Sequence, residues 1–201
     1  IREITKNKEK WEDIIDSVAF FLNENSSIVV KSKILWLLGE MGLNYPNKVR
    51  IYIEDIVSYL EDKHPKLRER AVNALGRIGR ADKNLIIPYK IMKMRKDDIG
   101  DVRLAFVWAC ENIATNAPEL FCEEMNMFYE MIQDKYVRVR IEAPEIFRVV
   151  GKRKPEYVKP YLEKLQWIAE NDSHPVVRIH SSGAVRITKK ALEEINNATD
   201  N

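Results

Sequence analysis

Apolar residues recur with helical spacing in five separate stretches of the chain. Each stretch follows two adjacent residues, a branched aliphatic residue and then a lysine or an arginine. Small or apolar residues stand three, six and seven positions after that cation, as Ala71, Ala74 and Leu75 stand after Arg68. This spacing places them on one face of a helix. No stretch alternates apolar and polar residues for long enough to predict a strand, so the pattern predicts an all-α chain.

An acidic or amide residue stands six positions before each of these cations, so that the whole pattern repeats. The acidic or amide residues are Asn25, Asp62, Asp97, Asp134 and Asp172. The cations, called the repeat cations below, are Lys31, Arg68, Arg103, Arg140 and Arg178. Successive repeat cations are 37, 35, 37 and 38 residues apart. A period of this length indicates stacked helix pairs that bury a shared core.

Another helical stretch precedes each helix that carries a repeat cation, and we expect these first helices at about 10–23, 47–61, 84–96, 118–133 and 156–170. The five pairs predict repeats at 10–43, 46–80, 84–115, 117–152 and 155–192 within a single domain, 1–195. Residues 196–201 are polar and aperiodic, which is typical of a frayed tail. Pro144 lies inside the fourth second helix, and we expect it to kink that helix or delay its start, because it removes a backbone hydrogen bond.

One repeat carries a family pattern. The segment Asp62-Lys-His-Pro-Lys-Leu-Arg-Glu-Arg-Ala-Val-Asn-Ala-Leu-Gly76 resembles the HEAT repeat closely, and residues 10–192 as a whole resemble the HEAT-like, or PBS-lyase-type, repeat family. The resemblance implies a right-handed α-α superhelix, a HEAT-like solenoid of five antiparallel helix pairs. It also implies a hydrogen-bonded ladder between successive repeats. The ladder would comprise Asp62, Arg68, Asp97, Arg103, Asp134, Arg140, Asp172 and Arg178, whereas the first repeat departs from it with Asn25 and Lys31.

Composition narrows the class of protein further. Lys+Arg 33 against Asp+Glu 31 gives a formal net charge of +2, which argues against a generally basic coat for nucleic acid. The longest apolar runs, 34–38 and 104–110, are far shorter than the roughly 20 residues that cross a bilayer, so we expect no membrane insertion. Two cysteines cannot form a disulfide framework, which favours a reducing, cytoplasmic setting.

We find no pattern that predicts an enzyme, a metal site or a cofactor site. His64 and His174 each precede a proline at the same repeat position, and the chain has neither a Cys-x-x-Cys nor a His-x-x-x-His pair for zinc. Cys110 replaces a core leucine of the repeat, and Cys122 has no identifiable base in sequence reach. We therefore predict no catalytic residue, no metal, no cofactor and no small-molecule substrate.

A functional surface is expected on the second helices, which line the concave side of a HEAT-like stack. Residues two, five and nine positions after a repeat cation point away from the core there. In the N-terminal half of this surface they combine cations with two tryptophans, a composition common in protein-binding hot spots. The candidate partner-binding residues are Lys33, Trp36, Arg70, Asn73, Arg77, Trp108 and Asn112. An alternative interpretation is that Trp36 and Trp108 pack against the adjacent repeat, because tryptophan is usually largely buried.

These observations predict a non-enzymatic scaffold that binds a segment of a partner protein on its concave face. Two alternatives stay open. The first is a nucleic-acid-binding HEAT-like protein that uses the basic concave residues, although Glu142 and Glu145 interrupt the basic track. The second is a HEAT-like lyase-type enzyme, which the chain resembles only in its repeat.

Overall fold

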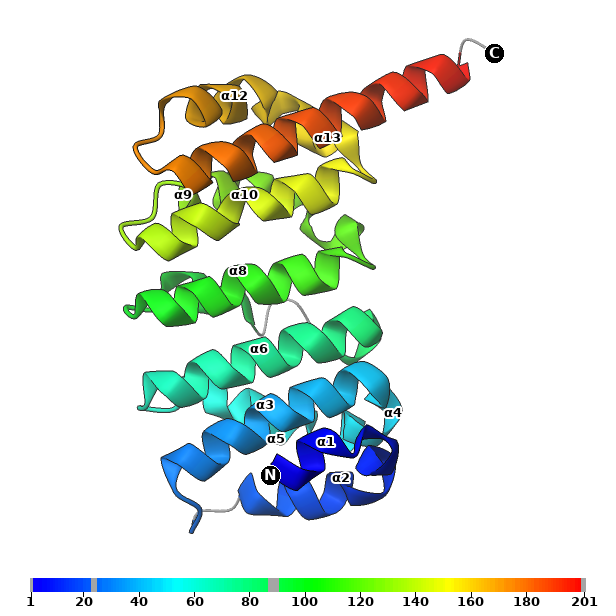
Figure 1. Cartoon of the computed structure of the whole chain (residues 1–201), viewed down its shortest axis with the longest axis vertical. Helices are drawn as coiled ribbons and strands as arrows, with labels where there is room; N and C mark the ends of the chain where they lie inside the picture. The colour runs from blue at the N-terminus through cyan, green and yellow to red at the C-terminus, as the bar shows by residue number, and fades with distance from the viewer. Residues whose placement is uncertain (1, 23–24, 87–90, 200–201) are drawn as a thin grey trace. The chain divides into compact units, whose positions relative to one another are not determined.

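A computed structural model describes residues 2–22, 25–86 and 91–199 (Figure 1). Within these residues the chain forms α-helices and 3-10 helices and no strand. Its contacts divide the chain into two compact units, Ile1–Ile113 and Ala114–Asn201, called unit 1 and unit 2 below. The expectation of a single domain at 1–195 stays a prediction. None of the described helices is long and apolar enough to cross a membrane.

Unit 1 contains three long helices and a series of short ones. The long helices are α3 (Ile28–Asn44), α6 (Pro65–Ala81) and α8 (Gly100–Ala114), whose last residue falls just beyond the unit boundary. The short α-helices are α1 (Arg2–Lys6), α2 (Trp11–Ala19), α4 (Pro46–Val49) and α5 (Ile53–Ser58). The 3-10 helices are η1 (Lys8–Lys10), η2 (Phe20–Leu22), η3 (Arg50–Tyr52), η4 (Tyr59–Glu61), η5 (Lys83–Leu85) and η6 (Lys93–Lys96).

Unit 2 repeats this alternation of broken and continuous helices. Its first helices are η7 (Pro118–Glu124) with α9 (Met125–Met131), and α11 (Pro155–Val158) with η8 (Lys159–Tyr161) and α12 (Leu162–Asn171). Its long second helices are α10 (Val137–Gly151) and α13 (Pro175–Thr199). α10 begins before Pro144 and continues beyond it, so the start of this helix is not delayed. α13 includes residues 196–199, where we expected a frayed tail.

The long helices of unit 1 pack side by side because glycines let their backbones approach closely (Figure 1). A Cβ placed on Gly39 would lie 2.7 Å from the Cα of Ala74, and one on Gly76 would lie 2.5 Å from the Cα of Ala109. Around these contacts α3 and α6 bury the apolar stripes that the sequence predicts. Leu37, Leu38, Ala71 and Leu75 are all 1 % exposed or less.

Unit 2 has a core of its own between α10, α12 and α13. Phe147, Leu165 and Ala184 are fully buried there. At the end of α10, Gly151 lies against Thr188 of α13, and a Cβ on this glycine would come 2.1 Å from the threonine hydroxyl oxygen. The fold of the chain is therefore all-α, with helix pairs packed as successive repeats inside each unit.

Candidate partner-binding site

The turns between paired helices share one hydrogen-bonding pattern. The repeat aspartates are Asp62, Asp97, Asp134 and Asp172. Each accepts a hydrogen bond at 2.7–2.9 Å on Oδ1 from the backbone N–H two residues later, which fixes the turn. Each repeat arginine donates from Nη1 to the carbonyl oxygen of the aspartate of its own repeat. The distances are 2.8 Å for Arg68, 2.7 Å for Arg103, 3.5 Å for Arg140 and 2.6 Å for Arg178.

Two of these arginines also reach the aspartate of the next repeat within their unit. In unit 1, Arg68 donates from Nε and Nη2 to the two carboxylate oxygens of Asp97, at 2.7 and 2.9 Å. In unit 2, Nε of Arg140 lies 3.9 Å from Oδ2 of Asp172. Burial raises the pKa of Asp97, but the hydrogen bonds from Arg68 and from a backbone N–H outweigh it and leave the pKa below its usual value. The guanidinium of Arg68 and the carboxylate of Asp97 thus meet each other's hydrogen-bonding needs, which is typical of a structural ion pair.

The first repeat departs from this pattern, as its sequence indicates. Ser27, and not an aspartate, caps α3 by accepting a hydrogen bond from the N–H of Val30 at 3.3 Å. The amino group of Lys31 lies 5.9 Å from the ring centre of Tyr59. The hydroxyl of Tyr59 donates to the carbonyl oxygen of Leu22 at 2.8 Å, and so joins the first two helix pairs.

Three of the predicted partner-binding residues come together in unit 1. Lys33 and Trp36 of α3 and Arg70 of α6 line a hollow of about 160 Å³ with Ser32. Trp36 is half-buried, so it is neither fully exposed to a partner nor fully packed against the adjacent repeat. Within the described residues, the ammonium of Lys33 and the guanidinium of Arg70 have no hydrogen-bond acceptor or ion-pair partner. The hollow therefore offers an indole and two cations to a ligand.

The next residues along this surface are paired with one another. Arg77 forms an ion pair with Glu40 of α3 at 2.6 Å, and its Nη1 lies 3.4 Å from the carbonyl oxygen of Asn73. Asn73 itself is only 8 % exposed. Its side chain therefore has little exposed surface to offer a partner.

Trp108 and Asn112 lie together on α8. The side-chain amide of Asn112 donates to the carbonyl oxygen of Trp108 at 2.8 Å and accepts from Nη1 of Arg80 at 3.4 Å. Trp108 is half-buried, like Trp36. All seven predicted residues thus lie in unit 1, four of them on helices α3 and α8 and three on α6 between them.

The structure adds two features that the sequence analysis did not identify. At the start of unit 1 an apolar hollow of about 590 Å³ lies between α1, α2 and α3, beside Phe21, which is 50 % exposed. In unit 2 a second hollow lies along α13 between Arg178 and Arg186. The adjacent aromatic residues Phe20 and Phe21 are a sequence signal for the first of these. The second becomes visible only when the packing of each repeat is compared with that of the others.

The two cysteines and His180 are buried or held by contacts within the fold. Cys110 and Cys122 are buried, and burial raises the pKa of the Cys122 thiol. Nδ1 of His180 lies 2.8 Å from the carbonyl oxygen of Ile141 and 3.4 Å from a carboxylate oxygen of Glu145. Among the described residues, no group of three or more His, Cys, Asp or Glu side chains could hold a metal ion.

Successive helix pairs, glycine-mediated helix contacts and paired turn residues define the class of protein: this is an α-solenoid repeat fold of the HEAT and armadillo type. A designed armadillo repeat protein in complex with the peptide (KR)4 is similar, with a TM-score of 0.70 and 18% identity over 93% of this chain and 90% of that chain. A crystal structure of an engineered protein gives a TM-score of 0.71 and 18% identity, covering 92% of this chain and 86% of that one.

A computationally designed armadillo repeat protein for modular peptide recognition gives a TM-score of 0.64 and 15% identity, and covers 92% of this chain and 93% of that one. Identities this low establish the fold alone. No protein-family model matches the chain, and no curated protein matches it either.

Proposed function

We propose that the chain is a non-enzymatic scaffold that binds a segment of a partner protein on the second helices of unit 1. The proposed contacts are Lys33, Trp36, Arg70, Arg77, Trp108 and Asn112. The observation that carries the proposal is the hollow in which Trp36 lies with Lys33 and Arg70, two cations that have no acceptor within the described residues. Tryptophan and arginine are the residues most often found to dominate binding energy at protein interfaces.

The charge of this hollow favours an acidic partner segment. Carboxylates would neutralise Lys33 and Arg70, while an apolar or aromatic side chain of the partner would cover the exposed part of Trp36. The similar designed protein binds the basic peptide (KR)4. The hollow here carries two cations instead, so we expect it to bind an acidic segment. The cytoplasmic location suggested by the two cysteines stays a prediction.

A peptide selection tests this proposal. The chain is used to select peptides from a random library displayed on phage, and the selected peptides are compared for charge and for binding to variants. We expect enrichment of peptides that combine acidic and aromatic residues. Enrichment of basic peptides, or of none above the background of an unrelated helical protein, would contradict the proposal.

Nucleic acid is the second candidate, because Lys33 and Arg70 could also meet phosphates while Trp36 stacks on a base. This alternative predicts binding to a random-sequence DNA oligonucleotide with a steep loss of affinity as salt is added. The Glu40–Arg77 ion pair lies beside these cations and dilutes the positive surface. We expect no such DNA binding, and a Lys33→Gln, Arg70→Gln variant that lost salt-sensitive DNA binding would favour the alternative.

A further inference from the structure

Arg178 is the repeat cation of the last described turn, and one edge of its guanidinium, formed by Nε and Nη2, donates to none of the described residues. Arg178 donates from Nη1 to the carbonyl oxygens of Asp172 and Ser173, at 2.6 and 3.3 Å. Arg68 holds its own turn in the same way and then places Nε and Nη2 on the carboxylate of Asp97. Within the described residues, Nε and Nη2 of Arg178 have no acceptor. The side chain is therefore fixed in a geometry that would receive a carboxylate.

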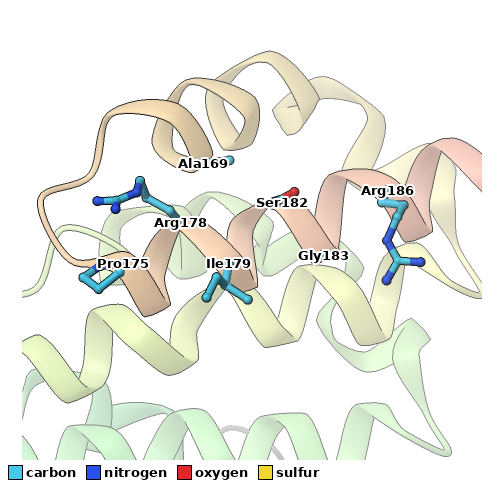
Figure 2. A pocket seen from close by; sticks show the side chains of 7 residues that line it. All are labelled: Ala169, Pro175, Arg178, Ile179, Ser182, Gly183 and Arg186. Atoms are coloured by element: carbon cyan, nitrogen blue, oxygen red, sulfur yellow. The ribbon is translucent and has the colours of Figure 1, made fainter.

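Arg178 also lines a hollow of about 510 Å³ along α13. The hollow is lined by Ala169, Pro175, Arg178, Ile179, Ser182, Gly183 and Arg186. Figure 2 shows Arg178 and Arg186 toward its two ends, with Ile179, Ser182 and Gly183 between them. Ile179 is 66% exposed, and a Cβ on Gly183 would meet nothing within 4 Å. The lining thus combines two arginines with an exposed isoleucine and contains no acidic side chain.

The same face does not fit another closely packed repeat. Four residues after the repeat cation, α3, α6 and α8 place a fully buried aliphatic residue, whereas α13 has Ser182, which is exposed. Eleven residues after the cation, α10 has Gly151, whose Cβ would clash with the following helix, whereas α13 has the exposed Lys189. Ser182 and Lys189 thus make this face of α13 more polar than the faces that α3, α6 and α10 pack against a following helix. A second copy stacked head to tail in the register of the repeats would bring Asn25 to Arg178, and not a carboxylate.

We propose that this hollow is a second interaction surface, and that it binds an extended acidic segment of a partner protein. An aspartate of that segment forms paired hydrogen bonds with Nε and Nη2 of Arg178, as Asp97 does with Arg68. An aliphatic residue covers Ile179 and fills the space over Gly183. Arg186 follows Arg178 by two helical turns, which is about 12 Å at about 1.5 Å per residue. An extended chain spans that distance in about four residues, so a second acidic residue stands about four positions from the first.

The test uses the whole chain and a fluorescein-labelled peptide with two aspartates about four residues apart and a leucine midway between them, because alternate side chains of an extended chain face the same side. Fluorescence anisotropy gives its affinity for the wild type and for variants. We expect Arg178→Gln to weaken binding roughly tenfold, because a charge-assisted pair is lost. Arg186→Gln removes a more exposed charge and should weaken it roughly two- to fivefold. Arg186 has no polar partner within the described residues, so this variant leaves the fold intact even if Arg178→Gln does not.

Three comparisons make the result specific. Arg153→Gln removes an exposed arginine of unit 2 outside the hollow and should leave the affinity unchanged. A peptide with asparagine in place of both aspartates should not bind. Trp36→Ala should still bind the acidic peptide, because that residue belongs to the surface proposed on unit 1. The proposal is overturned if the wild type does not bind the peptide, if the asparagine peptide binds equally well, or if Arg153→Gln weakens binding as much as Arg186→Gln.

Self-association is the remaining outcome. If sedimentation shows that the chain dimerises and that Arg186→Glu abolishes the dimer, the face is a contact between copies and the proposal is wrong. We expect the sedimentation coefficient to be the same for the wild type and for this variant.

Discussion

Gly76 lies where α6 comes closest to α8, and its replacement by alanine tests whether this contact holds the repeats of unit 1 together. The added Cβ would lie 2.5 Å from the Cα and 2.7 Å from the Cβ of Ala109. Non-bonded carbon atoms normally stay about 3.5–4.0 Å apart. Because both atoms belong to or adjoin the backbone, no side-chain rotation relieves the clash. The two helices would have to separate by about 1 Å.

Two opposing effects decide the size of the change. Overpacking of a tight interior costs about 1–3 kcal/mol, and a backbone clash lies at the upper end of this range. Alanine regains about 1 kcal/mol because it is a better helix former than glycine. We therefore expect Gly76→Ala to lower the free energy of unfolding by about 2 kcal/mol. With a urea m value of about 2 kcal/mol/M, the midpoint of unfolding falls by about 1 M.

Gly183→Ala is the matched control. This glycine also lies inside a long helix, but a Cβ on it would meet nothing within 4 Å. Only the helix propensity then changes, and the free energy of unfolding should rise by about 0.5–1 kcal/mol. Urea titrations followed by far-UV circular dichroism measure both variants. If Gly76→Ala is as stable as the wild type, or if both variants shift the midpoint in the same direction, the close approach of α6 and α8 does not stabilise unit 1.

Two further predictions concern the turn residues and the thiols. Asp97→Asn should destabilise the chain by about 2 kcal/mol at neutral pH, because Arg68 loses its charged acceptor. The folded-state pKa of Asp97 is depressed, so its stabilising effect is present above the unfolded pKa of about 3.9 and is lost as the pH falls through the folded value. The stability difference between wild type and variant should therefore shrink below pH 4, and a constant difference would contradict this. Cys110 and Cys122 should react slowly with an aromatic disulfide reagent until urea unfolds the chain, whereas fast reaction of the native chain would show that they are accessible.

The long second helices could be predicted because each repeat contains, at fixed positions, the apolar residues that these helices bury. The apolar residues after Arg68 predicted the buried face of α6, and the same offsets after Lys31 predicted that of α3. The first helices were harder to predict. Residues 156–170 were expected to form one helix, but they are divided among α11, η8 and α12, with Pro160 inside η8. One turn of 3-10 helix and one turn of α-helix bury nearly the same residues, so periodicity does not distinguish them.

The candidate site was predictable only where one helix determines it. Lys33 and Trp36 are three residues apart on α3, so helical geometry alone places them on one face. The Glu40–Arg77 ion pair joins two helices, and it depends on how these helices pack, which the residues of one helix do not determine. The open edge of Arg178 is harder still to foresee, because it is recognised only by comparison with the paired Arg68. Local sequence does not contain this information.

The proposed function requires Trp36 and its neighbouring cations to bind a partner segment. Its most direct test is the affinity of a selected acidic peptide for the wild type, for Trp36→Ala and for Trp167→Ala, measured by isothermal titration calorimetry. Trp167 is 64% exposed on α12 of unit 2 and serves as the matched tryptophan control. We expect Trp36→Ala to weaken binding about 30-fold, the effect of losing about 2 kcal/mol at a hot spot, with an unchanged melting temperature, and Trp167→Ala to bind like the wild type. Equal affinity of all three proteins, or early melting of Trp36→Ala, would contradict the claim.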